Sequence, residues 1–250
     1  MTFGDRFLLA WIALAAIVFV ALLFVPAPYG RYARRTWGPA IASRWAWLLM
    51  EAPAVLVMAG AFALGHHRGS WTALVFLLMW LAHYVPRAFV DPFLWREPTR
   101  RTPLAIVAMA IVFNVVNGLA NGRALFDRPP GYADAWLGDP RFVGGALLFA
   151  LGYWINRDAD RRLRHLRGPG ESGYRVPMGG LFRWVSCPNY LGEIVVWSGW
   201  AIATWSLAGL AFALWTIANL APRARDHHRF YRERFNDYPP ERRALVPGMW

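Results

Sequence analysis

Polar side chains that can donate or accept protons occur inside two stretches that are otherwise apolar. Glu51 lies in WAWLLMEAPAVLVMAGAFAL, and the next stretch ends in WLAHYVPRAFV, where His83 and Arg87 are four residues apart and Tyr84 follows His83. An ionisable group at membrane depth is costly unless it is paired or solvated, so each such residue is a functional hypothesis. Glu51 is predicted to be a site residue, with a carboxylate at the headgroup level as the alternative. Tyr84 is either a site residue or an interfacial aromatic, and His83 is either part of this cluster or a packing residue.

Further polar residues recur at helical spacing along the chain. Asn114 and Asn117 share one face of an apolar run, which fits helix–helix hydrogen bonding or ligand contact. Arginine, tyrosine and histidine donors on shared helix faces suit an anionic partner, although a solvated helix end would show the same arginines. The other residues at such spacing are Asn156, Asp160, Arg164, Arg167, Asn189, Glu193, Arg223, His227 and Tyr231, and the stretch before the sixth span adds Tyr174 and Arg175.

Long apolar stretches must position these residues. The chain has 250 residues, 57% of them hydrophobic and 17% charged, which is too apolar for a soluble domain of this size. A membrane-spanning helix needs about 20 apolar residues, and the apolar run of the first stretch is longer than the apolar region of roughly 7–15 residues in a signal peptide. The predicted fold class is all-α: a polytopic membrane protein with seven transmembrane helices, forming one integral-membrane domain over residues 1–250, with a further polar helix after the last span. The seven stretches are 7–27, 47–64, 71–90, 104–120, 142–156, 190–205 and 207–222.

The placement of arginine explains the net charge of +12. All 27 Lys and Arg residues are Arg. Segments 28–46, 91–103, 157–189 and 223–250, which seven spans place on one side, hold 21 of them; the other side holds 5, and Arg87 lies within a span. The positive-inside rule then predicts a cytoplasmic C-terminus, and arginines that follow topology argue against a nucleic-acid binder. Arg without Lys is typical of a GC-rich bacterial genome, so a bacterial inner membrane is predicted.

The familiar cofactor motifs do not occur. One cysteine, Cys187, excludes an intrachain disulfide framework or a cysteine-rich metal site, and no metal is expected. No strand pattern is recognisable and no G-x-G-x-x-G follows one, so a dinucleotide would bind without a Rossmann domain. From the residues alone, we predict a site at the arginine-rich end of the bundle for a phosphate-bearing cofactor and an apolar substrate from the bilayer.

Three segments carry a resemblance to a known family. The tail HHRFYRERFNDYPPERRALVP, the stretch GESGYRVPMGGLFRWVSCPNYLGEI and the element AHYVPRAFV resemble the steroid 5α-reductases, the 3-oxo-5α-steroid 4-dehydrogenases. The likeness extends from PYGRY through WLLMEAP to the C-terminus, almost the whole chain. It implies a seven-helix membrane enzyme, here expected to be a bacterial homologue, that uses NADPH to reduce the C4=C5 double bond of a 3-oxo-Δ4 steroid.

The resemblance also implies roles for residues. A carboxylate and a tyrosine that hold the 3-oxo group fall on Glu51 and Tyr84, the predicted catalytic residues: Tyr84 donates a hydrogen bond to the carbonyl oxygen, and Glu51, protonated or bridging to Tyr84, strengthens it. The eleven residues on the polar faces from Asn156 to Tyr231 would bind NADPH. Four weaker additions to that set are Tyr29, Trp47, Arg87 and Asn117.

Two departures from the family leave alternatives open. Met50 replaces the Gln that precedes the carboxylate in the animal enzymes, and Met109 stands where they can carry Arg. Reduction of an enone is thus a firmer prediction than reduction of a steroid. The alternatives are a reductase of another sterol or lipid enone, an S-adenosylmethionine-dependent isoprenylcysteine-type methyltransferase, and a transporter. The expected partners are an apolar enone and membrane lipid, with the chain as a monomer.

Overall fold

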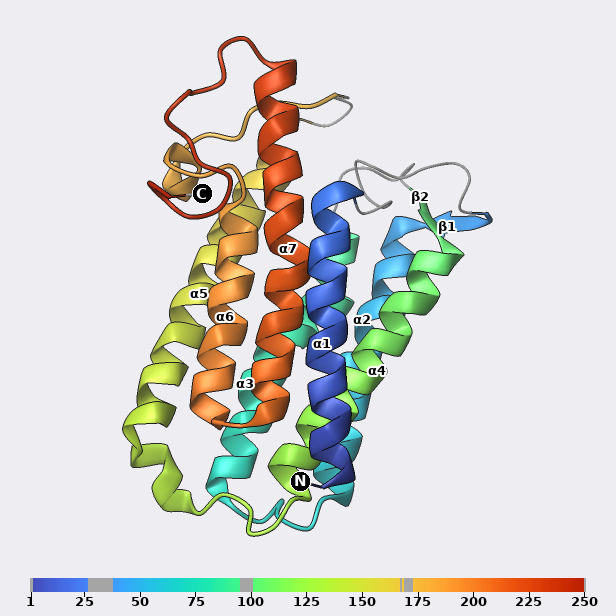
Figure 1. The fold of residues 1–250 in the computed structure, drawn as a ribbon, viewed down its shortest axis with the longest axis vertical. Coiled ribbons are helices and arrows are strands. Elements are labelled where there is room, and N and C mark those ends of the chain that lie inside the picture. The colour runs from blue at the N-terminus through green and yellow to red at the C-terminus, as the bar shows by residue number, and fades with distance from the viewer. Residues whose placement is uncertain (1, 27–37, 95–100, 167, 169–172, 250) are drawn as a thin grey trace. The chain divides into compact units, whose positions relative to one another are not determined.

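The computed structural model describes residues 2–26, 38–94, 101–166, 168 and 173–249 (Figure 1). Almost all of the regular structure in this part of the chain is α-helical, as predicted. The seven helices are α1 Phe3–Phe24, α2 Ser43–Leu64, α3 Trp71–Phe89, α4 Leu104–Phe126, α5 Pro140–His165, α6 Pro188–Thr204 and α7 Leu207–Arg234. Three short 3-10 helices are η3 Asp91–Phe93, η4 Asp134–Gly138 and η5 Gly180–Arg183.

Five helices of the described chain are long and apolar enough to cross a membrane: α1, α2, α3 together with η3, α4 and α7. The prediction of an all-α polytopic membrane protein is confirmed, and each of the seven predicted stretches coincides with a helix. α6 has 17 residues and α5 continues into a charged segment, so these two remain predicted spans. The expectation of a separate polar helix after the last span is wrong, because α7 continues without a break to Arg234, with Pro222 inside it.

Capping side chains stabilise the N-terminal ends of three helices. Thr2 and Asp5 form a capping box at α1, in which the Thr2 hydroxyl accepts from the Asp5 N–H and the Asp5 carboxylate accepts from the Thr2 N–H. Ser70 and Ser206 cap α3 and α7 in the simpler way, each accepting one backbone N–H bond. These caps satisfy N–H groups that have no partner within the helix.

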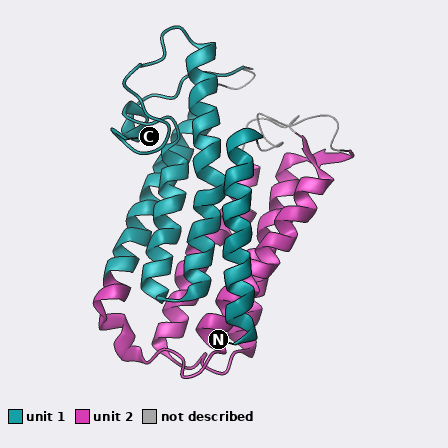
Figure 2. Cartoon of the chain, viewed as in Figure 1, with its two compact units in different colours: residues 1–27, 144–250 teal, residues 28–143 magenta. Residues whose placement is uncertain are grey.

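The chain separates into two compact units, residues 1–27 with 144–250 (unit 1) and residues 28–143 (unit 2), coloured in Figure 2. In unit 2, α2 packs against both α3 and α4. Gly118 and Gly122 of α4 lie so close to α2 that an added Cβ would be 2.9 Å from Val57 and 2.4 Å from Ala61. Two strands not foreseen from the sequence, β1 Ala40–Ala42 and β2 Arg101–Pro103, pair antiparallel. With three residues each, they are too short to show an alternating pattern.

In unit 1, α7 packs against α1 and α6. α5 and α6 touch backbone to backbone through four glycines, two on each helix, with a spacing of seven residues. An added Cβ would lie 2.3 Å from the Ala203 nitrogen at Gly145, 2.4 Å from the Val196 nitrogen at Gly152, 2.5 Å from the Asn156 nitrogen at Gly192 and 2.5 Å from the Phe149 nitrogen at Gly199. Only glycine permits so close an approach, so these residues fix the distance between the two helices.

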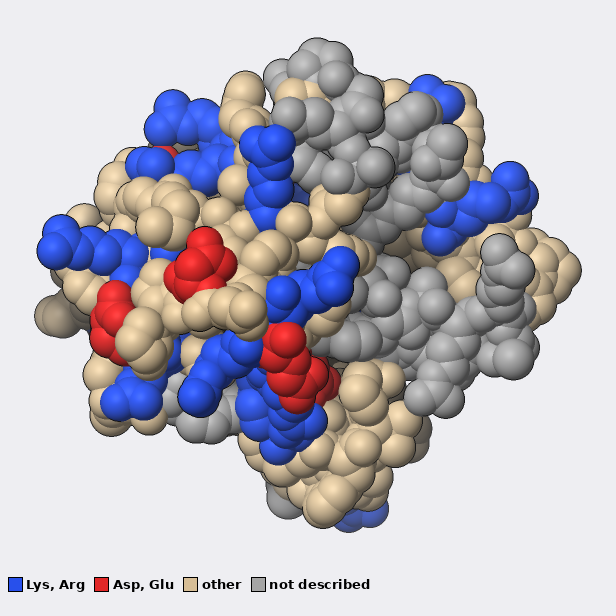
Figure 3. Space-filling view, turned by 90° about the horizontal axis from the view of Figure 1, so that it is seen from above, with Lys and Arg blue, Asp and Glu red and all other residues tan. Residues whose placement is uncertain are grey.

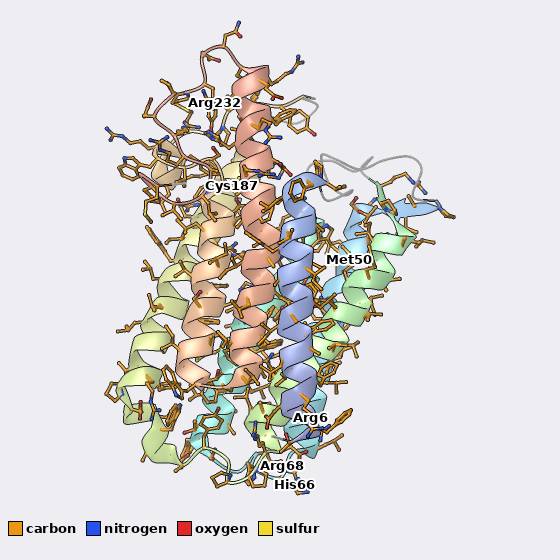
Figure 4. The ribbon with its side chains drawn as sticks, in the orientation of Figure 1. Arg6, Met50, His66, Arg68, Cys187 and Arg232 are labelled. Carbon is orange, nitrogen blue, oxygen red and sulfur yellow. The ribbon has the colours of Figure 1, made fainter. Side chains whose placement is uncertain are left out.

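Figure 4 labels six residues that mark the ends of the two units. In unit 1, Cys187 and Arg232 lie toward the end at which α7 finishes, and Arg6 lies at the opposite end. In unit 2, Met50 lies near one end of α2, while His66 and Arg68 lie beyond the other. Basic side chains gather on the face seen in Figure 3, where a few acidic groups are interspersed among them.

Candidate active site

A partly buried ion pair joins α2 to α3 in unit 2. Glu51 is 8% exposed, and its Oε1 accepts a hydrogen bond of 3.2 Å from Nε of Arg87. The Arg87 guanidinium also lies over the ring of Trp47, 5.2 Å from the ring centre. The structure thus brings the predicted catalytic residue Glu51 next to Arg87 and Trp47, which the resemblance assigned to the cofactor. The described partner of Glu51 is a cation on α3, so the carboxylate acts as a hydrogen-bond acceptor here.

Tyr84 lies on the same helix, three residues before Arg87. Its ring is 4% exposed and packs 4.9 Å from the ring of Trp80 and 5.1 Å from that of His83, which is also buried. Trp80 donates from Nε1 to the backbone oxygen of Ala54, 2.9 Å away on α2. Pro53, which has no backbone N–H, directly precedes Ala54 in α2. The bond from Trp80 therefore ties α3 to α2 next to this proline. Tyr84 therefore lies in an aromatic setting, three residues before the arginine that pairs with Glu51.

The two asparagines of α4 behave differently from one another. Asn114 donates from Nδ2 to the Met50 backbone oxygen, 2.7 Å away, so it makes the interhelical hydrogen bond that was one of its two predicted roles. Asn117 is 3% exposed and accepts from Asn121 through both its backbone and side-chain oxygens. Its side-chain Nδ2 has no hydrogen-bond acceptor among the described residues. A buried donor without an acceptor is costly, which favours the ligand-contact role for Asn117.

In unit 1, an amide and a carboxylate face each other across the α5–α6 contact. Nδ2 of Asn156 donates to Oε2 of Glu193 and to the Asn189 backbone oxygen, each at 3.0 Å. Trp197 approaches the other carboxylate oxygen of Glu193 at 3.4 Å. Asn156 and Glu193 are 5% and 8% exposed. The structure confirms that these three predicted residues lie together, and the glycine contacts of α5 and α6 set their spacing.

A second group links α6 to α7 through a tyrosine that sequence reasoning missed. The Tyr190 hydroxyl accepts from Nε of Arg223 at 2.9 Å and lies 3.1 Å from Nε2 of His227. Arg223 and His227 were predicted to share one face of a helix, and the continuous α7 places them so. Tyr190 follows the predicted Asn189 directly, but no spacing relates it to α7, so its role depends on tertiary packing.

The remaining predicted residues of unit 1 surround the outer part of this region. Tyr231 is buried and stacks on Tyr238, with the ring centres 5.5 Å apart. Tyr174 and Arg175 are exposed and line a cavity of about 320 Å³ together with Phe235 and Asp237. Two others, Asp160 and Arg164, are half-buried on α5. The predicted residues Tyr29 and Arg167 lie outside the described part of the chain.

The C-terminal tail closes over the segment between α5 and α6. Arg243 exchanges backbone hydrogen bonds with Trp184 and Ser186, and the Cys187 N–H bonds to the Ala244 oxygen. The Ser186 hydroxyl lies 2.6 Å from the Tyr238 hydroxyl and 2.7 Å from Nδ1 of His228. Burial raises the pKa of Tyr238 despite its hydrogen bond with Ser186, so the phenol stays protonated.

Arg242 fastens the tail further. Its side chain is 1% exposed and donates from one terminal nitrogen to the Pro177 oxygen at 3.0 Å and from the other to the Met178 sulfur. The guanidinium also lies 5.1 Å from the ring centre of Tyr238. The sequence suggested no role for Arg242, because its acceptors lie about 65 residues earlier in the chain.

Two clusters of buried polar side chains, each on apolar helices, define a membrane-embedded enzyme. The family model for 3-oxo-5-alpha-steroid 4-dehydrogenase matches residues 100–250. The chain is 41% identical to 3-oxo-5-alpha-steroid 4-dehydrogenase 1 of Bos taurus, with 100% of both chains covered. It is 39% identical to steroid 5-alpha-reductase DET2 of Gossypium hirsutum, over 97% of this chain and 96% of the relative. To 3-oxo-5-alpha-steroid 4-dehydrogenase 2 of Sus scrofa it is 44% identical, over 95% and 94%.

The chain therefore belongs to the 3-oxo-5-alpha-steroid 4-dehydrogenase family. This confirms the resemblance drawn from its three segments and the prediction of an oxidoreductase of steroid metabolism. Membership in this family implies a nicotinamide cofactor. The structure assigns contacts to most of the predicted site residues, and their roles in catalysis and cofactor binding stay predictions.

Proposed function

We propose that this protein catalyses the NADPH-dependent reduction of the C4=C5 double bond of a 3-oxo-Δ4 steroid to the 5α-reduced 3-oxosteroid. The observation that carries the proposal is the set of Glu51, Arg87 and Tyr84 in unit 2: Glu51 and Tyr84 are buried, and Glu51 pairs with the partly buried Arg87, three residues after Tyr84 on α3. It offers a phenol donor and a fixed charge pair in an apolar setting, which suits an apolar substrate with one carbonyl group. The relatives of this protein are named as steroid reductases and dehydrogenases, which supports the same substrate class.

Tyr84 is the residue that would meet the carbonyl. Negative charge builds on the 3-oxo oxygen while the β carbon is reduced, and a preorganised hydrogen-bond donor stabilises that charge most in a dry environment. Its packing against Trp80 and His83 fixes the direction of the phenol. Glu51 holds Arg87, which lies one turn beyond Tyr84 on α3, and so positions this end of the helix. We place Glu51 in the cluster as a carboxylate rather than as a proton donor.

The donors of unit 1 fit a dinucleotide phosphate. When bound, NADPH supplies the hydride that adds to C5, and a proton adds to C4. Arg223 and Arg175 would bind phosphate groups, with Tyr190 fixing the guanidinium of Arg223. Asn156 and Glu193 form a buried donor–acceptor pair that complements a carboxamide. The remaining predicted residues would complete the site, and the several arginines of this unit favour NADPH over NADH, since the 2′-phosphate needs a cation.

Met50 defines how tightly the steroid is held. Its side chain is 6% exposed, and only its backbone oxygen takes part in a described hydrogen bond, to Asn114. The amide that the animal enzymes carry at this position is absent, so the carbonyl depends on Tyr84.

We infer that the substrate enters from the bilayer, that the chain acts as a monomer and that the C-terminus faces the cytoplasm of a bacterial cell.

The test is an assay of the full chain purified in detergent. NADPH absorbance is followed with progesterone or testosterone present or absent, and the products are examined by mass spectrometry. The proposal predicts steroid-dependent oxidation and a product heavier by two hydrogen atoms. Binding of S-adenosylmethionine without any steroid-dependent oxidation would contradict it and favour a methyltransferase.

A further inference from the structure

Unit 1 carries a second cavity, of about 510 Å³, that the proposed function does not use. Residues of α5, of η5 and of the start of α6 line it, among them Trp154, Asp158, Arg162, Arg183 and Trp184. Positions 154, 158 and 162 lie two residues from 156, 160 and 164. Two residues along an α-helix correspond to a rotation of about 200°, so the cavity is on the side of α5 opposite to Asn156 and Asp160.

The charge inside this cavity is positive. Asp158 accepts from Nε of Arg162 at 2.7 Å and from Arg161 at 3.0 Å, and these bonds hold the pKa of its carboxyl group below the ordinary value. One carboxylate therefore faces two arginines. Arg183 adds a third cation, and its guanidinium lies 5.6 Å from the ring centre of Trp184, with no hydrogen-bond acceptor or carboxylate partner among the described residues. The terminal nitrogens of Arg162 likewise have no acceptor among the described residues.

Two glycines shape the wall next to Arg162. Gly179 and Gly180 have φ values of 79° and 53°, which favour glycine. A Cβ at these positions would lie 2.7 Å and 2.8 Å from nitrogens of the Arg162 side chain. The bare backbone of this turn therefore leaves room for the guanidinium, which stays 37% exposed at the cavity.

Apolar side chains lead away from the charged groups. On α5, Leu147, Leu151 and Trp154 are 67%, 49% and 64% exposed and follow one another at helical spacing on one face. Trp184 is 49% exposed beside the same cavity. Tryptophan is enriched where the hydrocarbon core meets the headgroups, and α5 changes here from apolar residues to Asp158, Arg161 and Arg162. The cavity thus lies at the level of the lipid headgroups.

We propose that this cavity is a binding site for one anionic membrane phospholipid. The phosphate lies between Arg162 and Arg183, and an acyl chain lies along Trp154, Leu151 and Leu147. Basic pockets beside membrane helices recognise anionic headgroups, and guanidinium groups bind phosphate through paired N–H donors. An anionic headgroup also complements the surplus of positive charge around Asp158. This site is separate from the proposed cofactor site and does not depend on it.

Native mass spectrometry of the full chain in detergent tests the proposal. The protein is titrated with phosphatidylglycerol or with phosphatidylcholine of the same acyl chains. We expect one phosphatidylglycerol to bind at least about fivefold more tightly, and Arg183→Gln to reduce its affinity about fivefold, the effect of one arginine near a membrane surface. Arg162→Gln should act in the same direction.

The matched control is Arg234→Gln, which removes an exposed arginine at the end of α7 that does not line the cavity. It should leave phosphatidylglycerol binding unchanged. Equal affinity of the unaltered protein for the two lipids, or equal losses in Arg183→Gln and Arg234→Gln, would overturn the proposal. Displacement of the lipid by an equal concentration of inorganic phosphate would overturn the assignment to a membrane lipid.

Discussion

The two units hold their polar residues in place by different means. In unit 2, the Glu51–Arg87 pair joins two helices through a hydrogen bond of 3.2 Å, and the Arg87 guanidinium lies over the ring of Trp47. In unit 1, the Asn156–Glu193 pair lies beside helices that touch through glycine backbones, with the C-terminal tail closed over the adjoining segment. Side chains thus define the cluster of unit 2, whereas backbone spacing defines that of unit 1.

This difference has consequences for substitution. Exchanging one side chain in unit 2 should change chemistry while the helices keep their positions. In unit 1, one methyl group added at a glycine of the α5–α6 contact should move α5 against α6 and disturb every residue that depends on their distance. The following predictions test this contrast, from the largest expected effect to the smallest.

Gly192→Ala should give the largest change in stability. The new Cβ would lie 2.5 Å from the Asn156 nitrogen and 2.8 Å from its Cα, both in backbone that cannot yield without moving α5. Overpacking of this kind costs about 2–3 kcal/mol, which corresponds to a fall of about 5–10 °C in melting temperature for a protein of this size. The measurement is the thermal midpoint of the purified protein in detergent.

Gly144→Ala is the matched control for that substitution. It adds the same methyl group to the same helix, at a position where nothing lies within 4 Å of the new Cβ. The melting temperature should stay equal or rise slightly, because alanine favours helix. Equal losses in both variants would mean that glycine contacts do not set the spacing of α5 and α6.

Tyr84→Phe and Glu51→Gln should lower steroid turnover by more than tenfold, a loss of more than about 1.4 kcal/mol in transition-state stabilisation. Neither residue is among those assigned to the cofactor, so the affinity for NADPH should stay within about twofold. Turnover and the Kd of NADPH are measured on the same preparations. Full activity in both variants would remove Glu51 and Tyr84 from the proposed mechanism.

Asn156→Ala should weaken NADPH binding about tenfold, the effect of removing a buried donor from Glu193 and from the Asn189 oxygen. Turnover at saturating NADPH should change much less, in contrast to Tyr84→Phe. Fluorescence titration with NADPH and the KM for the cofactor provide the measurement. A large fall in turnover at unchanged cofactor affinity would contradict the role assigned to unit 1.

Asp139→Asn should have the smallest effect, although Asp139 also pairs with an arginine. Its carboxylate accepts two hydrogen bonds from the Arg141 side chain, at 2.9 Å and 2.8 Å, and these lower its pKa from 3.8 to about 2. A carboxyl with a lowered pKa stabilises the fold above its ordinary pKa, and this contribution disappears as the pH falls from 3.8 toward 2. Because the pair is exposed, removing it at pH 7 should lower the melting temperature by less than about 3 °C.

Much of this architecture could be predicted from the sequence because apolar periodicity determines the helices. All seven helices were located, and helical spacing placed Arg223 and His227 on one face of α7. The hydrogen bond from Asn114 to Met50 was one of two alternatives that spacing alone left open. What the pattern cannot show is which helix a polar residue meets, because that depends on packing between distant segments.

The features that could not be predicted from the sequence depend on packing between segments far apart in the chain. Tyr190 receives Arg223 from 33 residues away, and Arg242 binds Pro177 from 65 residues away. The close contacts of Gly145 and Gly152 leave no trace in hydropathy, and β1 and β2 meet only through tertiary structure. The expected partner of Glu51 was Tyr84, and the contact that the structure provides is the ion pair with Arg87.

The most direct test of the account follows a label from cofactor to product. The purified full chain is incubated with a 3-oxo-Δ4 steroid and with NADPH in which deuterium replaces both hydrogens at C4 of the nicotinamide ring. The account predicts a 5α-reduced steroid with one deuterium, located at C5 by mass spectrometry and NMR, and a rate reduced more than tenfold in Tyr84→Phe. A product without deuterium at C5, or no steroid product while NADPH is consumed, would contradict it.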